Sequence, residues 1–310
     1  MSALRQFADE VGPVGPVVAV GGRTQWDVGG VPDPAARPVM PPAGVVSYEP
    51  AEMIVRVGAG TPVAELQATL ADAGQMVPLD PAHPERATVG GVLAVGQSGP
   101  RRLRYGPLRD TVLESTHVSA EGTLIKAGAP VVKNVSGYDL CRLLVGSLGT
   151  LGLLGEVVLR VQPLPAARQW WHARCVDPFE VCARLFRPSS VLWDGESTWV
   201  LLEGHPADIA DESSRLTPAF TPTEEMPELP AAGRLSVRPG QIRELASALT
   251  PGRFVAEVGV GLIHLSDGAS DPVTEPRSSH SSLDADAARL NDELKARFDP
   301  SGRLNPGRRP

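Results

Sequence analysis

The chain has 310 residues, of which 42% are hydrophobic and 21% charged, so it can bury a sizeable core and is too long for one minimal domain. Its net charge of -7 argues against nucleic-acid binding, because phosphate binding needs a surplus of positive charge. Its three cysteines, Cys141, Cys175 and Cys182, form no CxxC pair, which excludes a disulfide scaffold, a zinc ribbon and a four-cysteine iron–sulfur cluster held by this chain alone.

Apolar stretches are too short for a membrane span. The longest uncharged one, residues 143–155, has 13 residues, whereas a transmembrane helix needs about 20. The first ten residues carry acids and lack the apolar core of a signal peptide. We therefore expect the protein in the cytoplasm, either free or held at the inner face of the membrane through partners.

The N-terminal half predicts short elements separated by glycines. Thr61-Pro62 opens a helix, because threonine caps free N–H groups and proline has no N–H to leave unpaired. Further helices are expected from about Thr88 and over 138–145. Glu121-Gly122 predicts a hairpin. The strands expected are 17–20, 45–48 paired with 53–57, 111–119, 123–126 and 156–161.

Pro163 and Pro165 mark a predicted domain boundary. Beyond it the order strand, helix, strand occurs twice, which suggests a ferredoxin-like α+β layer. The strands are expected at 170–175, 198–203, 234–237, 254–258 and 261–265, and the helices from 177 and over 239–249. The Pro- and Glu-rich residues 206–232 predict a long surface loop. A linker, 266–282, then precedes a terminal helix over 283–298.

Common nucleotide and hydrolase motifs are absent from the sequence. No lysine follows a glycine, so there is no Walker A loop, and neither HExxH nor GxSxG occurs. Gly58-Ala59-Gly60 lacks the third glycine of the dinucleotide fingerprint. Nucleophilic hydrolase chemistry therefore has no visible site.

Two glycine-rich turns remain as candidate anion sites. Gly21-Gly22-Arg23-Thr24-Gln25 directly follows a strand, so its backbone N–H groups can converge on an anion, with Thr24 adding a hydroxyl and Arg23 a positive charge. Thr88-Val89-Gly90-Gly91 offers a second cradle at a helix N-terminus, where the helix dipole favours an anion by roughly 0.3–1 kcal/mol. Taken alone, each also fits an ordinary tight turn.

Further motifs follow these turns in a fixed order. They comprise residues 98–110 and 131–139, then Gly146-Ser147-Leu148-Gly149-Thr150-Leu151-Gly152, and finally Leu304-Asn305-Pro306-Gly307-Arg308. This succession resembles the FAD-binding domain of the vanillyl-alcohol oxidase and p-cresol methylhydroxylase (PCMH-type) superfamily. Within it, the chain is most similar to the family of smaller FAD-binding subunits of bacterial glycolate oxidases. The resemblance covers residues 17–165, returns at 298–308 and is thin between them.

The resemblance implies an α+β fold in three parts. A two-lobed PCMH-type FAD-binding domain (1–163) is followed by a smaller ferredoxin-like α+β cap domain (164–270), and a linker with a C-terminal helix (271–310) returns to the first domain. The cofactor-binding residues carried over by position are Gly21, Gly22, Arg23, Thr24, Gln25, Thr88, Gly90, Gly91, Ser98, Gly99, Gly152, Leu153 and Leu154. Of these, Gly21 to Gln25 would cradle the pyrophosphate. Family members with covalent flavin carry a histidine in that loop; this chain has none there, so we expect non-covalent FAD.

The resemblance also implies a reaction and partners. The substrate would be a small 2-hydroxy acid that passes a hydride to FAD, and the electrons would pass to an iron–sulfur subunit beside a larger FAD-binding catalytic subunit. The cap region lacks a cluster of histidines and acids, so two alternatives stay open: a non-catalytic flavin-binding or electron-relay subunit, and a stand-alone FAD-dependent alcohol oxidoreductase. The catalytic residue is unknown, and His264, on a predicted strand, is a weak candidate for a base.

Other residues have both a functional and a structural interpretation. Arg101, Arg102 and Arg104 fit a substrate carboxylate or, more simply, a solvated loop or a contact with phosphate or a partner, and His83 fits a flavin contact or a turn. Structural roles are expected for Tyr105, for an Arg109–Asp110 ion pair, for Lys133, Tyr138 and Asp139, and for Cys141 in the core. Of Trp170 and Trp171, the outward-facing ring would either be solvated or mark a subunit interface.

Overall fold

The structure is a computed structural model and describes residues 2–130, 139–267 and 285–309. The chain divides into two compact units. Met1–Gly99, Pro107–Leu164 and Leu283–Pro310 form unit 1, and Pro100–Gly106 with Pro165–Ser282 forms unit 2. The chain passes from unit 1 to unit 2 after Leu164, which lies between Pro163 and Pro165. Nothing in the sequence had indicated that the short segment Pro100–Gly106 belongs to unit 2.

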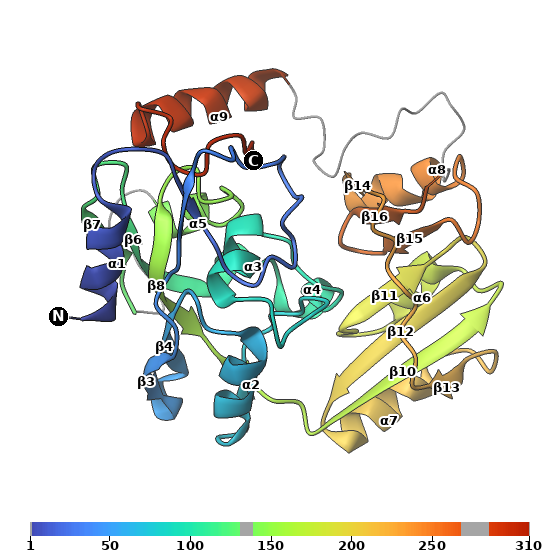
Figure 1. The fold of residues 1–310 in the computed structure, drawn as a ribbon. Helices are drawn as coiled ribbons and strands as arrows, with labels where there is room; N and C mark the ends of the chain where they lie inside the picture. Colours follow the sequence, from blue (N-terminus) through green and yellow to red (C-terminus); the bar gives the residue numbers. More distant parts are fainter. Residues whose placement is uncertain (1, 131–138, 268–284, 310) are drawn as a thin grey trace. The chain divides into compact units, whose positions relative to one another are not determined.

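Unit 1 contains a five-stranded antiparallel sheet in the order β3-β4-β8-β6-β7 (Figure 1). Its strands are β3 (Val45–Glu49), β4 (Ile54–Gly58), β6 (Val112–Val118), β7 (Leu124–Gly128) and β8 (Leu153–Arg160). All five had been expected, with shifts of up to three residues at their ends. The β6–β7 hairpin turns at Gly122, whose φ of 76° is a conformation that glycine adopts without strain.

The helices of unit 1 cover this sheet. They are α1 (Ala3–Val11), α2 (Val63–Ala71), α3 (Val89–Val95), α5 (Leu140–Leu144) and α9 (Ala285–Phe298), with the short 3-10 turns η1 (Pro50–Glu52) and η2 (Leu108–Asp110). The buried residues of α2 are Val63, Leu66 and Leu70, at the spacing of a helical stripe. Helix α1 was not anticipated from the sequence, although Phe7 and Val11 are buried on one face of it.

A second, two-stranded parallel sheet joins β1 (Val17–Ala19) to β2 (Arg37–Val39), and a small pair joins β5 (Gln75–Met76) to β9 (Gln162–Pro163). Apolar side chains pack in separate clusters around the sheets. The larger includes residues of α2, α3 and β8, and a second one brings Phe7, Val17 and Leu304 together. The β1 strand ends at the first glycine-rich turn, and Leu304 bridges to Val17 in parallel.

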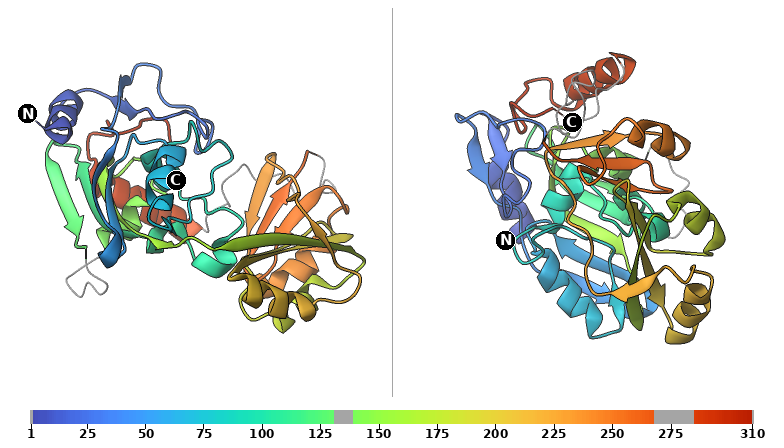
Figure 2. Two further views of the ribbon diagram at one scale, coloured as in Figure 1. Left: turned by 90° about the horizontal axis from the view of Figure 1, so that it is seen from below. Right: turned by 90° about the vertical axis from the view of Figure 1, so that its right-hand side faces the viewer.

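Unit 2 is a seven-stranded antiparallel sheet in the order β13-β10-β12-β11-β15-β16-β14 (Figures 1 and 2). The strands are β10 (Ala167–Arg174), β11 (Ser190–Trp193), β12 (Ser197–Gly204), β13 (Thr221–Thr223), β14 (Gly233–Ser236), β15 (Phe254–Glu257) and β16 (Leu262–Leu265). The helices are α4 (Arg102–Tyr105), α6 (Pro178–Arg184), α7 (Pro206–Ser214), α8 (Ile242–Ala246) and the 3-10 turn η3 (Pro239–Gln241). Apolar residues of α6, α7 and α8 pack with the strands in two clusters.

Strands β10 to β13, with α6 and α7 between them, follow the chain order strand, helix, strand, strand, helix, strand. The sequence interpretation of 206–232 as a long loop was wrong, because this range holds α7 and β13, and it also missed β11. Helix α7 has no fully buried residue, so it lacks the apolar stripe that reveals a helix in a sequence. Its start was nevertheless readable: Pro206 stands in the first turn, where its missing N–H costs nothing.

Across the described ranges, we find no helix that combines the length and the apolar character needed to cross a membrane.

Candidate functional site

A cleft in unit 1 collects most of the glycine-rich turns. The space between its walls is about 800 Å³ when the open mouth is included. The turn after β1, both ends of α3, the loop before β8 and the C-terminal segment line it. Of the residues predicted from the sequence, those that line the cleft are Gly21, Gly22, Arg23, Thr24, Gln25, Thr88, Gly90, Gly91, Gly152, Leu153 and Leu154.

Ser98 and Gly99 were predicted to belong to the same site, but the structure does not bring them to the cleft wall. The Oγ atom of Ser98 accepts a hydrogen bond from the backbone N–H of Leu108, at 3.2 Å. Gly99 packs so closely against Asp80 that a Cβ atom there would overlap the Asp80 side chain. Both residues therefore have a structural explanation, and a contact with a cofactor stays a prediction.

The turn after β1 lines the cleft and contains free hydrogen-bond donors. Within the described residues, the backbone N–H groups of Gly22 to Gln25 have no hydrogen-bond acceptor. Arg23 has a φ of 55°, a left-handed conformation that is costly for a residue with a side chain and that is often found at functional sites. Successive N–H groups in such a turn form a concave anion site.

The second predicted anion site, at the start of α3, does not offer the free glycine N–H groups that were expected there. The N–H of Gly90 donates to the carbonyl of Ala59 at 2.7 Å, and the N–H of Gly91 to Oγ1 of Thr88 at 3.2 Å. Both glycine donors are therefore used inside the protein. Gly90 is needed for close packing, because a Cβ atom there would lie 2.7 Å from Cβ of Ala59. The turn shapes the wall of the cleft rather than supplying it with donors.

Two arginines bring positive charge to the same end of the cleft. The guanidinium of Arg23 lies 5.0 Å from the centre of the Trp26 ring, and that of Arg308 lies 4.8 Å from it. Arg308 also donates to the carbonyls of Trp26, at 2.6 Å, and Val28, at 2.7 Å. Burial lowers the pKa of Arg308, yet a guanidinium stays charged at any physiological pH. In the sequence, Arg308 stands out only as part of a motif. Its role beside this turn is not predictable, because Arg308 lies far along the chain from Trp26.

Another part of the cleft wall is apolar. It is formed by Leu144, Leu153 and Leu154 together with Gly152. Behind Gly152 lies His117, whose ring would be 2.6 Å from a Cβ atom at position 152. His117 is only 2% exposed, and burial lowers its pKa to about 4, so the ring is neutral at pH 7. No motif in the sequence indicates that His117 packs behind the cleft wall.

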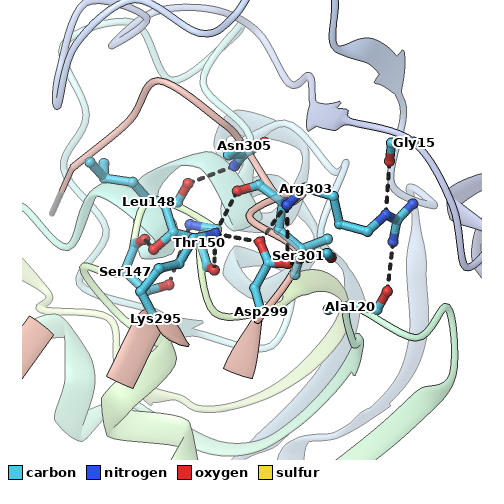
Figure 3. Close-up of polar contacts among 12 residues, drawn as sticks. Gly15, Ala120, Ser147, Leu148, Thr150, Lys295, Asp299, Ser301, Arg303 and Asn305 are labelled. Carbon is cyan, nitrogen blue, oxygen red and sulfur yellow. Dashed lines mark hydrogen bonds and ion pairs between the residues drawn. The ribbon is translucent and has the colours of Figure 1, made fainter. Parts of the chain in front are cut away.

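The loop before β8 and the C-terminal segment meet at this cleft with unusual backbone geometry. Leu148 has a φ of 52° and Asn305 a φ of 44°, and both residues line the cleft. The side-chain amide of Asn305 donates to the carbonyl of Leu148 at 2.6 Å (Figure 3). Of the non-glycine residues with positive φ in the described chain, those at the cleft are Arg23, Leu148 and Asn305.

The weak catalytic candidate His264 lies in unit 2, on β16. Its Nε2 atom is 2.7 Å from Oε1 of Glu257, a side chain only 2% exposed. The histidine therefore has a buried acidic partner, which is equally compatible with a structural ion pair and with an oriented base. His83 is exposed in unit 1, 4.0 Å from Glu85, and does not line the cleft.

The basic run of the sequence is anchored within unit 2. Arg104 donates to the carbonyl of Glu203, and Arg101 lies 3.5 Å from the Glu203 carboxylate. The hydroxyl of Tyr105 donates to Oε2 of Glu203 at 3.3 Å. Burial, with the nearby charge of Glu203, raises the pKa of Tyr105 to about 12. The structural interpretation of Tyr105 is supported, and these arginines hold the segment in place.

The remaining candidates have mixed outcomes. The predicted Arg109–Asp110 ion pair was wrong: Asp110 pairs with Arg142 at 3.0 Å, because the short turn of η2 leaves Arg109 exposed. Cys141 is buried in the core of unit 1, as predicted. The ring of Trp171 packs on the core of unit 2, whereas Trp170, its neighbour on β10, points to the other face. Lys133, Tyr138 and most of the motif at 131–139 lie outside the described residues.

A scan against protein families matches residues 15–128 to the model described as FAD binding domain. The match indicates FAD as the cofactor, and the PCMH-type resemblance of the sequence motifs is confirmed. The described residues hold no group of three or more side chains able to bind a metal ion.

Curated proteins similar to this chain are oxidoreductases by name. "Glycolate oxidase subunit GlcE" of Escherichia coli is 46% identical over 125 residues, which is 40% of this chain and 36% of that protein. "D-lactate dehydrogenase [cytochrome], mitochondrial" of Arabidopsis thaliana is 33% identical over 53% of this chain and 28% of its own length. "Glycolate oxidase subunit GlcD" of Bacillus subtilis is 40% identical over 31% of this chain and 19% of its own length. The matches thus span about a third or less of these relatives.

Among solved structures, an alkyldihydroxyacetonephosphate synthase matches with a TM-score of 0.63 over 98% of this chain and 73% of its own. Its sequence identity is 15%, so this likeness supports the fold alone.

The cleft of unit 1 fits the chemistry of FAD. The free N–H groups of Gly22 to Gln25 and two guanidinium groups suit a diphosphate. The wall of leucines suits an apolar ring system. A Cβ atom at Gly21 or Gly22 would overlap neighbouring atoms, so the cradle exists in this form only with glycine at both positions.

Proposed function

We propose that this chain is the FAD-binding subunit of an oxidoreductase that acts on a small 2-hydroxy acid such as glycolate or lactate. The observation that carries the proposal is the cleft of unit 1, where unpaired backbone donors, two arginines and an apolar wall converge. Residues 15–128 of this unit match an FAD-binding domain. The names of the relatives, glycolate oxidase subunits and D-lactate dehydrogenases, give the substrate class. The substrate and activity rest on matches that span about a third of those proteins.

Each part of the cleft has a separate task in this proposal. The N–H groups of Gly22 to Gln25 would hold the diphosphate, and Arg23 and Arg308 would balance its charge. Leu153 and Leu154 would contact the ring, and the neutral His117 behind Gly152 would keep that wall uncharged. When bound, FAD supplies a two-electron acceptor for the hydride of the substrate.

The FAD in this proposal is non-covalent. The described residues that line the cleft include no histidine, cysteine or tyrosine, the side chains that could bond to the flavin. The test is simple: the yellow colour of the purified chain should survive gel filtration and appear in the supernatant after acid precipitation. Colour retained in the pellet would contradict non-covalent binding.

Partners complete the proposed enzyme. Two relatives are named as subunits of glycolate oxidases, so we propose a larger FAD-binding catalytic subunit and an iron–sulfur subunit beside this chain. The electrons would leave through the iron–sulfur subunit, because the three cysteines of this chain cannot hold a four-cysteine cluster. The complex would be cytoplasmic, or held at the inner membrane face by its partners.

Unit 2 is proposed as the ferredoxin-like cap domain, with His264 as its candidate base. The carboxylate of Glu257, 2.7 Å from Nε2 of His264, would orient the imidazole. A His264→Gln substitution should then reduce turnover in the assembled enzyme without changing the amount of bound FAD. Unchanged turnover would leave the His264–Glu257 pair with a structural role only.

An accessory role is the second candidate, because His264 already has a buried partner and the described part of unit 2 offers no cluster of histidines and acids. Anaerobic addition of glycolate or D-lactate to the FAD-loaded chain separates the two. Bleaching of the flavin absorption band would identify this chain as the site of oxidation. A bound flavin that stays oxidised would assign oxidation to a partner and electron relay to this chain.

A further inference from the structure

The C-terminal segment is tied to unit 1 by a buried charge network at the end of α9. The ammonium of Lys295 contacts the Asp299 carboxylate and donates to the carbonyls of Thr150, at 2.8 Å, and Leu304, at 3.0 Å (Figure 3). The side chain of Asp299 is fully buried. It accepts from the backbone N–H of Leu304 at 2.7 Å and of Arg303 at 3.1 Å.

These contacts fix the turn after α9 in one conformation. Burial alone would raise the pKa of Asp299, but the hydrogen bonds from Lys295 and from the backbone hold that pKa below its ordinary value. The carboxylate is therefore charged at neutral pH, and all of its strong donors come from the turn or from α9. The network therefore holds the residues that follow α9 in a fixed position.

Arg303 then anchors the segment to a region away from the cleft. Its guanidinium donates to the carbonyls of Val11, Gly15 and Ala120 at distances of 2.8 to 3.0 Å. Its backbone carbonyl accepts from Val17 N–H at 2.9 Å, so the segment runs beside β1. None of Val11, Gly15 and Ala120 lines the cleft. This anchor therefore concerns the stability of unit 1.

Asn305, two residues later, reaches the cleft itself. Its Oδ1 atom accepts from the N–H of Ala19 at 2.9 Å, and its Nδ2 atom donates to the carbonyl of Leu148 at 2.6 Å. Ala19 ends β1 just before the turn that starts at Gly21. Leu148 lies in the loop before β8 and has a positive φ. Ala19, Leu148 and Asn305 all line the cleft. One amide thus joins the two sides of the site.

We propose that Asn305 is a positioning residue for FAD: its amide sets the spacing between the diphosphate turn after β1 and the loop at Leu148. The inference rests on the proposed placement of FAD in this cleft. The amide is uniquely suited, because it offers a donor and an acceptor on one short, rigid group. The neighbouring Gly149 leaves room for it, since a Cβ atom at that position would overlap Nδ2 of Asn305.

The test compares four variants of the full chain. Asn305→Ala removes both bonds. Asn305→Asp keeps the shape and the acceptor for Ala19 but has no N–H for Leu148, and it serves if the alanine variant does not fold. Ser301→Ala is the matched control on the same turn, because among the described residues its hydroxyl hydrogen-bonds to Asp299 alone. Arg303→Lys weakens the anchor away from the cleft.

The dissociation constant for FAD is measured by calorimetry below the melting temperature, with the melting temperature of the apoprotein and the visible circular dichroism of bound FAD. We expect both Asn305 variants to weaken FAD binding at least tenfold and to change the dichroism. Ser301→Ala and Arg303→Lys should keep the dissociation constant within twofold, although Arg303→Lys should lower the melting temperature.

Two results would overturn the inference while leaving the proposed function intact. The first is wild-type FAD affinity in both Asn305 variants. The second is an equal loss of affinity in Arg303→Lys, which would make the segment a general stabiliser. A wild-type chain that does not bind FAD would instead contradict the proposed function, and the inference with it.

Discussion

The Cα atom of Gly22 lies directly against the backbone carbonyl of Arg86. A Cβ atom at position 22 would overlap the carbonyl oxygen and lie 2.5 Å from the carbonyl carbon. In the same contact, the guanidinium of Arg86 donates to the carbonyl of Gly22 at 3.4 Å. Since a backbone neighbour cannot rotate away as a side chain can, this packing fixes the turn that carries the free N–H groups.

The first prediction concerns this contact. Gly22→Ala should displace the turn and weaken FAD binding by at least about tenfold, or about 1.4 kcal/mol. Fluorescence quenching of added FAD measures the change. Gly240→Ala is the control, because nothing lies within 4 Å of a Cβ atom there. Unchanged affinity in Gly22→Ala would show that the turn does not hold the cofactor.

The second prediction concerns the buried His117. Its pKa is about 4 in the folded chain, against about 6.5 when unfolded. Between these two pH values the unfolded chain binds the proton more readily than the folded chain. The contribution of His117 to the free energy of unfolding is therefore fully present above about pH 6.5 and is lost as the pH falls toward 4. Lowering the pH from 7 to 5 should therefore reduce the free energy of unfolding by about 2 kcal/mol through this histidine.

Urea unfolding at the two pH values checks this sign and size. His117→Phe should show a fall in unfolding free energy about 2 kcal/mol smaller than the wild type. His83→Ala is the matched control, because His83 is exposed and should leave the pH dependence as it is. An identical fall in wild type and His117→Phe would mean that the histidine is not buried uncharged.

The third prediction concerns a buried carboxylate in the five-stranded sheet. Glu114 on β6 has a side chain only 1% exposed and pairs with Arg56 at 2.7 Å and Lys126 at 2.9 Å. Arg56→Met leaves a buried charge with one exposed partner and should lower the free energy of unfolding by about 3 kcal/mol. Denaturant titration measures it.

A surface pair provides the comparison for that experiment. Arg184 lies 3.2 Å from Glu180, and both side chains are more than half exposed. Arg184→Met should cost less than about 0.5 kcal/mol. Equal effects of the two substitutions would contradict the account of Glu114 as a buried charge that depends on its partners.

The fourth prediction concerns the charge of Arg308. Arg308→Ala removes one cation from the cleft and releases the carbonyls of Trp26 and Val28, so FAD affinity should fall at least about tenfold. The remaining affinity should depend less on salt concentration than in the wild type. Arg309→Ala, a change at an exposed neighbour, should leave both properties unaltered. Equal salt dependence in the wild type and both variants would contradict a contact between Arg308 and the phosphates.

Much of unit 1 was predictable because its signals are local. The hairpin at Gly122 and the cap at Thr88 each depend on a few adjacent residues. The glycine-rich turn after β1 was recognised for the same reason. By contrast, the contact of Asn305 with Ala19 joins residues 286 positions apart. The spacing of residues in a single sequence does not predict such a long-range contact.

Burial and long-range partners explain the other differences. His117 lies on a strand whose burial does not simply alternate, and only the packing against Gly152 shows its place behind the cleft. The helix α7 escaped notice because it lacks a buried stripe. At α3, the helix start at Thr88 was predictable, but the use of the Gly90 N–H by Ala59 could be seen only in three dimensions.

A crystal structure of the chain grown with FAD would locate the cofactor. We predict diphosphate density within hydrogen-bonding distance of the N–H groups of Gly22 to Gln25, with the ring against Leu153 and Leu154. FAD density at any other place in the chain, or a clear empty cleft at saturating FAD, would contradict it.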